Sequence, residues 1–305
     1  MKRSPIGMAK FKQAQDVENP MGLIQEVATR WNSAFAMVKG LLDTNDTLST
    51  VLLSLPKAPL PFSVEEIDIM KELAKLLSPF QEATVAISGS KYVTISLLIP
   101  LTCEIQQKLN NLKSKLKTVE VLSALKFLCT RLNTRFLHYE TRTVAQIATI
   151  IDPRFKKEGF LTITNADQAA TALETEIDNF LSKTPQELQT LSEPSPNPTF
   201  SFLQNKVKVK VKSTRADAIM TLGQHLENLN EPKETDPLLY WKWMNTGGMM
   251  PFKAAARKYF CIPATSCESE RMFSKAGQII SERRSRLKPE VVDQLLFLNK
   301  NQDLF

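Results

Sequence analysis

Few residues of this sequence are of the types that bind metals or perform nucleophilic chemistry. The four cysteines form no Cys-x-x-Cys pair, and neither of the two histidines stands beside one of them; these residues are Cys103, Cys129, Cys261, Cys267, His138 and His225. A zinc finger needs four ligands at defined spacings, so a local finger is excluded. We expect free thiols and a protein of a reducing compartment.

Two carboxylates near the C-terminus have the spacing of a helix start. Thr265 and Glu268, just after Pro263, are three residues apart as in a capping box, and Gly277 could end that helix in a left-handed cap. Glu270 would then lie in the first turn. By itself it is a solvated or ion-paired carboxylate, because a divalent metal needs further oxygen ligands.

Basic residues occur in three groups that could contact phosphates. They are Arg30 beside Trp31, then Arg154, Lys156 and Lys157, and then Arg283, Arg284 and Arg286. The net charge of +7 permits a nucleic-acid partner but is also explained by solubility. Each group could equally be a solvated face, and Arg30 could pair with Glu26. Trp241 and Trp243 are predicted to lie in the core.

The spacing of apolar residues predicts an α-helical middle. A capping box of Ser63 and Glu66 begins a helix, Pro100 lies in the first turn of the next, and Asp152-Pro153 separates later helices. Further helices are predicted over about Val119 to Phe136 and about Ala166 to Leu181. Asp152, before a proline, most simply caps a turn. The densest apolar stretch is too short to span a bilayer, so no membrane partner is expected.

After residue 190 the composition changes. Ser192 to Pro198 reads as a linker, and the alternation over Lys206 to Lys212 predicts an edge strand or a solvated tether. A helical block follows from about Arg215, and Pro289 opens its last helix.

Apolar residues of the last two helices form stripes that a short helix pair cannot bury alone. Another domain or a second copy of the chain must cover them. These residues are Met272, Phe273, Ile279, Ile280, Leu287, Val292, Leu295, Leu296 and Leu298.

Three segments carry a family resemblance. They are Glu26-Val-Ala-Thr-Arg-Trp-Asn-Ser33, Ile150-Ile-Asp-Pro-Arg-Phe-Lys156, and Ala255 to Asn299 with its core Ser269-Glu-Arg-Met-Phe-Ser274. In this order they resemble hAT-superfamily transposases, in particular the BED-finger, Activator-like branch. The resemblance covers the chain from about residue 21 to the end.

This resemblance implies a mostly α fold: a helical insertion domain, an incomplete RNase H-like α/β remnant and C-terminal dimerisation helices. We expect a basic lead over 1–22, the RNase H-like junction and insertion over 23–190, the linker over 191–214 and the dimerisation region over 215–305. Strands are expected near Gln25 to Thr29 and Val207 to Val211. In the family the tryptophan at position 31 is implicated in handling the base beside the cut; the alternative is a buried residue at the core-to-insertion junction.

The resemblance also implies a catalytic role for one residue only. Such nucleases hold two metal ions with three acidic residues, and the last acid matches Glu270. Asp16 is the sole aspartate before the Thr-Arg-Trp-Asn-Ser segment, and its setting resembles neither of the family's two aspartates. We therefore expect no enzyme and no cofactor, with Mg²⁺ or Mn²⁺ relevant only if a complete nuclease core is supplied.

Three functional hypotheses follow. The first is a transposase-derived nuclear protein that forms a homodimer or higher homo-oligomer through its C-terminal region and binds DNA non-specifically. The second is a fragment of an active hAT transposase whose BED finger and two catalytic aspartates are missing from this chain. The third is a helical adaptor in which Arg30, Trp31 and Glu270 tolerate substitution.

Overall fold

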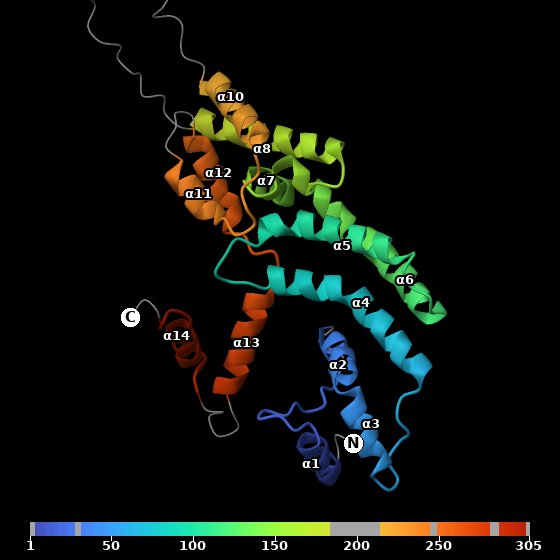
Figure 1. Ribbon diagram of the computed structural model, residues 1–305. Coiled ribbons are helices and arrows are strands. Elements are labelled where there is room, and N and C mark those ends of the chain that lie inside the picture. Colours follow the sequence, from blue (N-terminus) through green and yellow to red (C-terminus); the bar gives the residue numbers. More distant parts are fainter. Residues whose placement is uncertain (1–3, 28–31, 184–213, 245–248, 281–286, 303–305) are drawn as a thin grey trace, which may run out of the picture. The chain divides into compact units, whose positions relative to one another are not determined.

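The computed structural model describes residues 4–27, 32–183, 214–244, 249–280 and 287–302. Within these ranges the chain is mostly helical (Figure 1). The helices are α1 (Pro5–Gln13), α2 (Asn32–Asp43), α3 (Asn45–Leu53), α4 (Val64–Ile87), α5 (Leu98–Leu112), α6 (Val119–Arg135), α7 (Thr143–Ile151), α8 (Ile163–Lys183), α10 (Thr214–Glu227), α11 (Pro237–Trp243), α12 (Met250–Phe260), α13 (Cys267–Ile279) and α14 (Pro289–Lys300), with short 3₁₀ turns η1 (Ile95–Leu97), η2 (Leu137–Thr141) and η3 (Lys156–Gly159). None of the described helices is long and apolar enough to cross a membrane.

The predicted helices of the middle are confirmed, although α8 begins three residues before and ends two residues after its predicted bounds. The capping box before α4 is complete: Ser63 N–H donates to Glu66 at 2.8 Å, and Glu66 N–H donates to Ser63 Oγ at 3.2 Å. Pro100 lies in the first turn of α5, and α7 ends at Ile151 with Asp152 as its C-cap. Each boundary rests on a local signal, which is why the sequence could indicate it.

Of the two predicted strands, neither is found among the described residues. Near Gln25, the backbone is extended and only Val27 makes an isolated bridge, while residues 28–29 lie outside the described ranges. Val207 to Val211 also lies outside them. The RNase H-like remnant therefore stays a prediction.

The chain divides into two compact units. The first unit is Met1–Ala86 with Leu101–His138, and the second unit is Ile87–Pro100 with Tyr139–Phe305. The first unit has two apolar clusters, one around Phe11 and Leu48 and another around Leu76, Leu109 and Val121. The predicted domain boundaries remain predictions.

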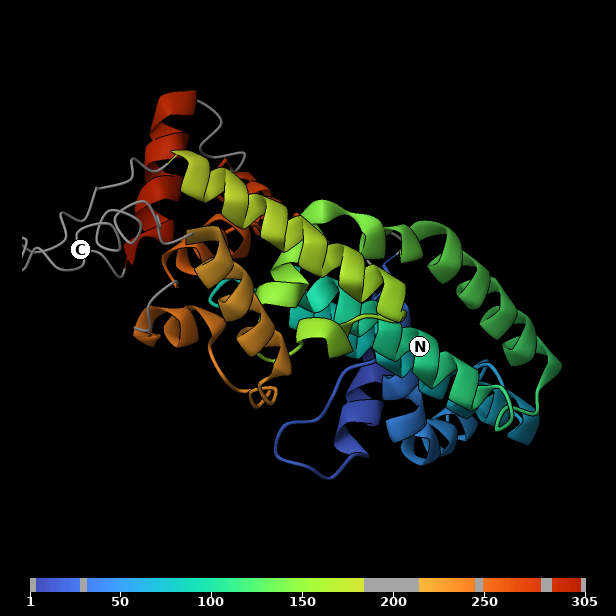
Figure 2. The ribbon, with the colours of Figure 1, turned by 90° about the horizontal axis from the view of Figure 1, so that it is seen from above.

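The second unit is built around α7, whose residues Ala145 to Ile151 are all buried. A helix that is apolar all round must be enclosed by other elements. It packs against η1, α8 and α12, and α8 in turn packs against α10 (Figure 2). Phe252 and Leu173, both at 0% exposure, join this core from α12 and α8. Segments far apart in the sequence thus share one interior.

The start and end of α13 differ from the prediction. The helix begins at Cys267 with Ser266 as its N-cap, one residue later than a Thr265 cap would place it. Thr265 Oγ1 donates to Ile87 O at 3.4 Å and accepts from Cys267 N–H at 3.4 Å, while the Glu268 carboxylate pairs with Arg271 and Lys300, so the predicted capping box of Thr265 with Glu268 is wrong. Gly277 lies inside α13, which continues to Ile279, so its predicted role as a left-handed cap is also wrong.

Candidate functional site

The helical hairpin of α13 and α14 is attached to the second unit through the turn that precedes α13. Ala264 N–H donates to Thr94 Oγ1 at 3.1 Å, and Cys267 Sγ lies 3.4 Å from Ser88 Oγ. With the bond from Thr265, these contacts hold the entry to α13 against residues 87–94 of the same unit. The rest of the hairpin extends from this anchored end.

Polar contacts fix the two helices of the hairpin to each other. The carboxylate of Glu268 accepts from Arg271 on its own helix and from Lys300 on α14. These two cations lower the pKa of Glu268 to about 2, the Lys300 hydrogen bond being the larger cause. Lys275 Nζ also donates to Asn299 Oδ1. The pairing leaves each helix with one inner and one outer face.

The hairpin exposes several large apolar side chains to solvent. The exposed fractions are 77% for Phe273, 49% for Ile280, 38% for Leu295 and 50% for Leu298. Large apolar side chains left in water are unfavourable by roughly 25 cal/mol per Å² of surface that a partner could cover. We call the exposed residues Phe273, Ile280, Leu295, Phe297 and Leu298 together the terminal apolar face.

The other residues predicted for dimerisation lie differently. Met272, Ile279, Leu287 and Leu296 are half-buried, and Val292 is 6% exposed. Val292 is therefore buried within its own chain, which is one of the two routes that the sequence left open. Phe297, at 60% exposure, was missed by the sequence reasoning. The signal was available, because four consecutive apolar residues from Leu295 cover more than one side of a helix with 3.6 residues per turn.

Glu270 lies exposed in the first turn of α13, where its carboxylate accepts a hydrogen bond from Ser266 Oγ at 3.0 Å. This is a contact between two side chains four residues apart on one helix surface. In the part of the chain that the structure describes, no three His, Cys, Asp or Glu residues are grouped to hold a metal ion.

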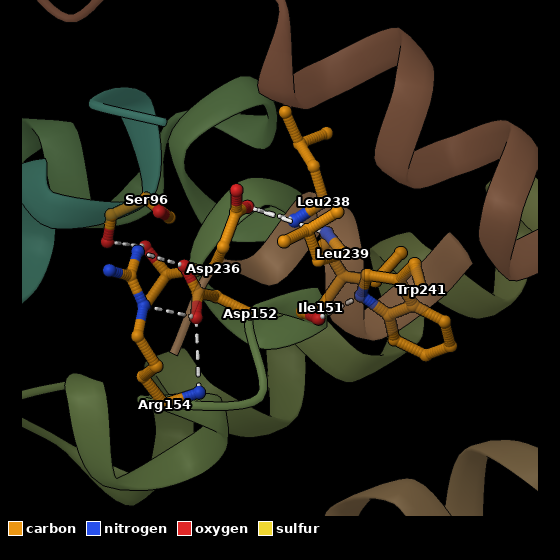
Figure 3. A network of polar contacts seen from close by, with 9 residues as sticks. Ser96, Ile151, Asp152, Arg154, Asp236, Leu238, Leu239 and Trp241 are labelled. Carbon is orange, nitrogen blue, oxygen red and sulfur yellow. Dashed lines mark hydrogen bonds and ion pairs between the residues drawn. The ribbon is translucent and has the colours of Figure 1, made fainter. Parts of the chain in front are cut away.

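Asp152 and Arg154 form a buried pair after α7. Asp152 Oδ1 accepts from Arg154 Nε at 2.9 Å and from Arg154 N–H at 3.0 Å, and Oδ2 accepts from the guanidinium at 2.7 Å (Figure 3). The predicted turn cap by Asp152 is confirmed. Arg154 already has a bidentate carboxylate partner and a side chain only 9% exposed, so a phosphate contact would require it to exchange partners.

Lys156 and Lys157 point to different environments. Lys156 is 1% exposed, adopts a positive φ of 47°, and donates from Nζ to Asn228 O at 2.8 Å and Leu229 O at 3.0 Å. Burial lowers its pKa. Its amine holds the turn after α10, which differs from the predicted phosphate contact. Lys157 is half-buried, and its Nζ pairs with Asp167 at 3.0 Å, so a phosphate contact would compete with that carboxylate.

The remaining predicted contacts lie outside the described residues. These are Arg30, Trp31, Arg283, Arg284 and Arg286.

The two tryptophans of α11 have opposite environments. Trp241 is 2% exposed, donates from Nε1 to Ile151 O at 3.0 Å (Figure 3), and stacks on Phe252 with ring centroids 5.8 Å apart. Trp243 is 71% exposed. The prediction of a core position is therefore confirmed for Trp241 and wrong for Trp243. Residues that are two positions apart on a helix point to different sides, so only one of these two tryptophans could enter the core of the second unit.

Comparison with known proteins relates this chain to transposases and BED zinc finger proteins. Residues 218–302 match the hAT family C-terminal dimerisation region. The chain is 26% identical to the human zinc finger BED domain-containing protein 4, over 99% of this chain and 26% of that protein. It is 24% identical to the putative AC transposase of Zea mays, over 97% of this chain and 39% of that protein. It is also 24% identical to the putative transcriptional regulator tpeD of Talaromyces stipitatus, over 96% of this chain and 34% of that protein. The chain thus spans well under half the length of these relatives.

Proposed function

Because this chain is related to hAT transposases over nearly its whole length and carries a hAT family C-terminal dimerisation region, we propose that it is a transposase-derived protein that self-associates through its terminal apolar face. One observation supports this proposal above all. The hairpin of α13 and α14 leaves Phe273, Phe297 and Leu298 each at least half exposed. A second copy offers the same apolar face, so an isologous pair would bury both at once.

The test is the mass of the chain in solution. By multi-angle light scattering at tens of micromolar, we expect the wild type at twice 34.4 kDa or more, and the double variant Phe273→Asp/Leu298→Asp at the monomer mass. Two aspartates at the centre of a dimer would be desolvated without partners, which costs several kcal/mol in total. Both residues are exposed in the single chain, so its own fold should persist.

Ile163→Asp is the matched control. Ile163 is 82% exposed and begins α8, where a carboxylate is favoured by the helix dipole. This variant should keep the wild-type mass. A wild-type monomer, or a double variant of undiminished mass and native circular dichroism, would contradict self-association through this face.

The second part of the proposal is weak, sequence-independent DNA binding in the nucleus. It is supported by the net charge of +7 and by the basic residues Arg283, Arg284 and Arg286. Binding through phosphates releases counterions, so affinity should fall steeply as salt rises from about 50 to 200 mM. Fluorescence anisotropy with a duplex at several salt concentrations measures this. An affinity independent of salt would overturn it.

DNA cleavage is not part of the proposed function. Of the family's three metal-binding acids, only Glu270 has a match in the sequence, and one carboxylate cannot hold two divalent ions. The second candidate, a catalytic transposase in which this chain is the C-terminal part, would be favoured instead if the chain cut DNA with Mg²⁺ or Mn²⁺ and Glu270→Ala abolished the cut.

A further inference from the structure

Trp243 presents its indole ring to solvent at the end of α11. The side chain is 71% exposed, and Lys242 Nζ lies 5.6 Å from its ring centroid. A tryptophan buries more apolar surface than any other side chain when it enters a core or an interface, so leaving it exposed is unfavourable in the isolated chain. Trp241, on the same helix, is buried in the core of the second unit. Trp243 is not part of the core that the described residues of the second unit form.

Basic side chains lie on α11 and on the helix packed against it. The helices α11 and α12 lie side by side (Figure 1), and Lys253 Nζ on α12 donates to Lys242 O at 3.4 Å on α11. Arg257 is four residues after Lys253, so it lies one turn along the same side of α12, and its side chain is exposed. We call Lys242, Lys253 and Arg257 the basic strip of these two helices; Lys242 is the member that contacts the Trp243 ring.

Neither α11 nor α12 contains a carboxylate. The segments Pro237–Trp243 and Met250–Phe260 contain four basic residues and no acidic residue, the fourth being Lys258. Two carboxylates close to these helices have partners of their own. Asp236 accepts from Leu238 N–H at 2.8 Å and caps α11, and Glu176 accepts from Lys258 and from Tyr259 at 3.1 Å. A surface of one charge sign attracts a polyanion.

We propose that Trp243, Lys242, Lys253 and Arg257 form a binding site for single-stranded nucleic acid. An exposed aromatic ring beside cations is the arrangement on which unpaired bases stack while phosphates contact the cations. In a duplex the base faces are already stacked, so the indole would add little there. The neighbouring exposed side chains of Leu239 and Met250 can extend the apolar contact with a base or sugar. The site deepens the proposed DNA binding by assigning it a location and a preferred form of the ligand.

The first measurement compares affinities by fluorescence anisotropy. Labelled oligo-dT and oligo-rU, about 15 nucleotides long, are titrated with the full chain at low salt. Loss of one base-stacking platform is expected to weaken binding at least about fivefold in Trp243→Ala. Trp243→Phe should retain most of the affinity because a phenyl ring still stacks. Lys242→Ala/Arg257→Ala should weaken binding and reduce its salt dependence.

Leu60→Ala is the control for loss of an exposed apolar side chain, since Leu60 is 87% exposed in the first unit and its replacement should leave the affinity unchanged. The second measurement follows tryptophan fluorescence. Stacking on Trp243 should quench the emission of the wild type on adding unlabelled oligonucleotide, and Trp243→Phe should lose that quenching. Preference for dT or for rU identifies DNA or RNA as the source of the ligand, and either one supports the site.

The outcomes separate this site from the proposed function. Unchanged single-strand affinity in Trp243→Ala overturns the site, and if duplex binding still falls with salt, the proposed DNA binding stands without it. No binding to any nucleic acid at low salt overturns both. A lower light-scattering mass for Trp243→Ala would assign the ring to contact between copies and also overturn the site. The Phe273→Asp/Leu298→Asp variant should keep its single-strand affinity.

Discussion

Replacing Trp241 by alanine is expected to lower the free energy of unfolding of the second unit by about 4 kcal/mol. The indole is 2% exposed, and its ring centroid lies 5.8 Å from that of Phe252 and 5.1 Å from that of His225. Truncation removes these contacts and leaves a cavity between α7, α11 and α12. It also deprives Ile151 O of the donor that lies 3.0 Å away.

Urea denaturation followed by far-ultraviolet circular dichroism measures this loss. Trp243→Ala is the matched control, because the same side chain is removed two residues later on the same helix. Its exposed ring leaves no cavity, so we expect a change within about 0.5 kcal/mol. Equal losses in the two variants would contradict the assignment of Trp241 to the core and Trp243 to the surface.

Lowering the pH from 7 to 5 is expected to destabilise the second unit by about 2 kcal/mol through His225 alone. This side chain is 3% exposed, and its Nε2 lies 3.2 Å from Ile150 O. A carbonyl only accepts, so Nε2 carries the proton. Within the described residues, the buried Nδ1 has no hydrogen-bond partner, so a second proton would be bound there without compensation.

The direction of the pH effect follows from the pKa. Burial is the largest cause that lowers the pKa of His225 from 6.5 to about 4; the charge of Lys156 lowers it further, while the bond to Ile150 O and the charge of Asp152 oppose the shift. Above pH 6.5 neither state binds the proton. Between pH 6.5 and 4 the unfolded chain takes it up while the folded chain does not, so stability falls, and below pH 4 this contribution levels off.

His225→Gln tests the assignment. Glutamine keeps a side-chain donor for Ile150 O but does not titrate. The free energy of unfolding of the variant should therefore change less between pH 6.5 and 4 than that of the wild type. Denaturant melts at half-unit pH intervals give the two slopes. Parallel slopes for the wild type and His225→Gln would show that other groups cause the acid sensitivity.

The helices could be predicted from the sequence where their limits depend on nearby residues. Ser63 and Glu66 act within one turn, and Pro100 and Pro289 restrict the backbone at their own positions. The start of α13 could not be predicted in this way. Thr265 has the right spacing for a cap, but its hydroxyl bonds Ile87 O from another part of the chain. Tertiary contacts override local signals at such positions.

In the candidate site, too, some features could be predicted from the sequence and others could not. The need for the terminal helices to be covered followed from their apolar stripes, and Phe273, Ile280, Leu295 and Leu298 are exposed as that reasoning requires. The assignment of single residues did not follow. Val292 is buried in the single chain, and Lys156 Nζ donates to carbonyls of the turn after α10. Which side of a helix meets which neighbour depends on the packing, and a single sequence does not specify it.

The shared interior of the second unit restricts how the C-terminal region can be used. Residues 218–302 supply Trp241, Phe252 and Phe260 to a core whose other half comes from η1, α7 and α8, all of which precede position 218. If residues 218–302 were expressed alone, they would lose the surfaces that enclose these aromatic residues. We expect such a fragment to aggregate non-specifically. It is therefore not a transferable module. Fusing it to another protein should transfer aggregation rather than specific pairing, unless residues 87–100 and 139–183 accompany it.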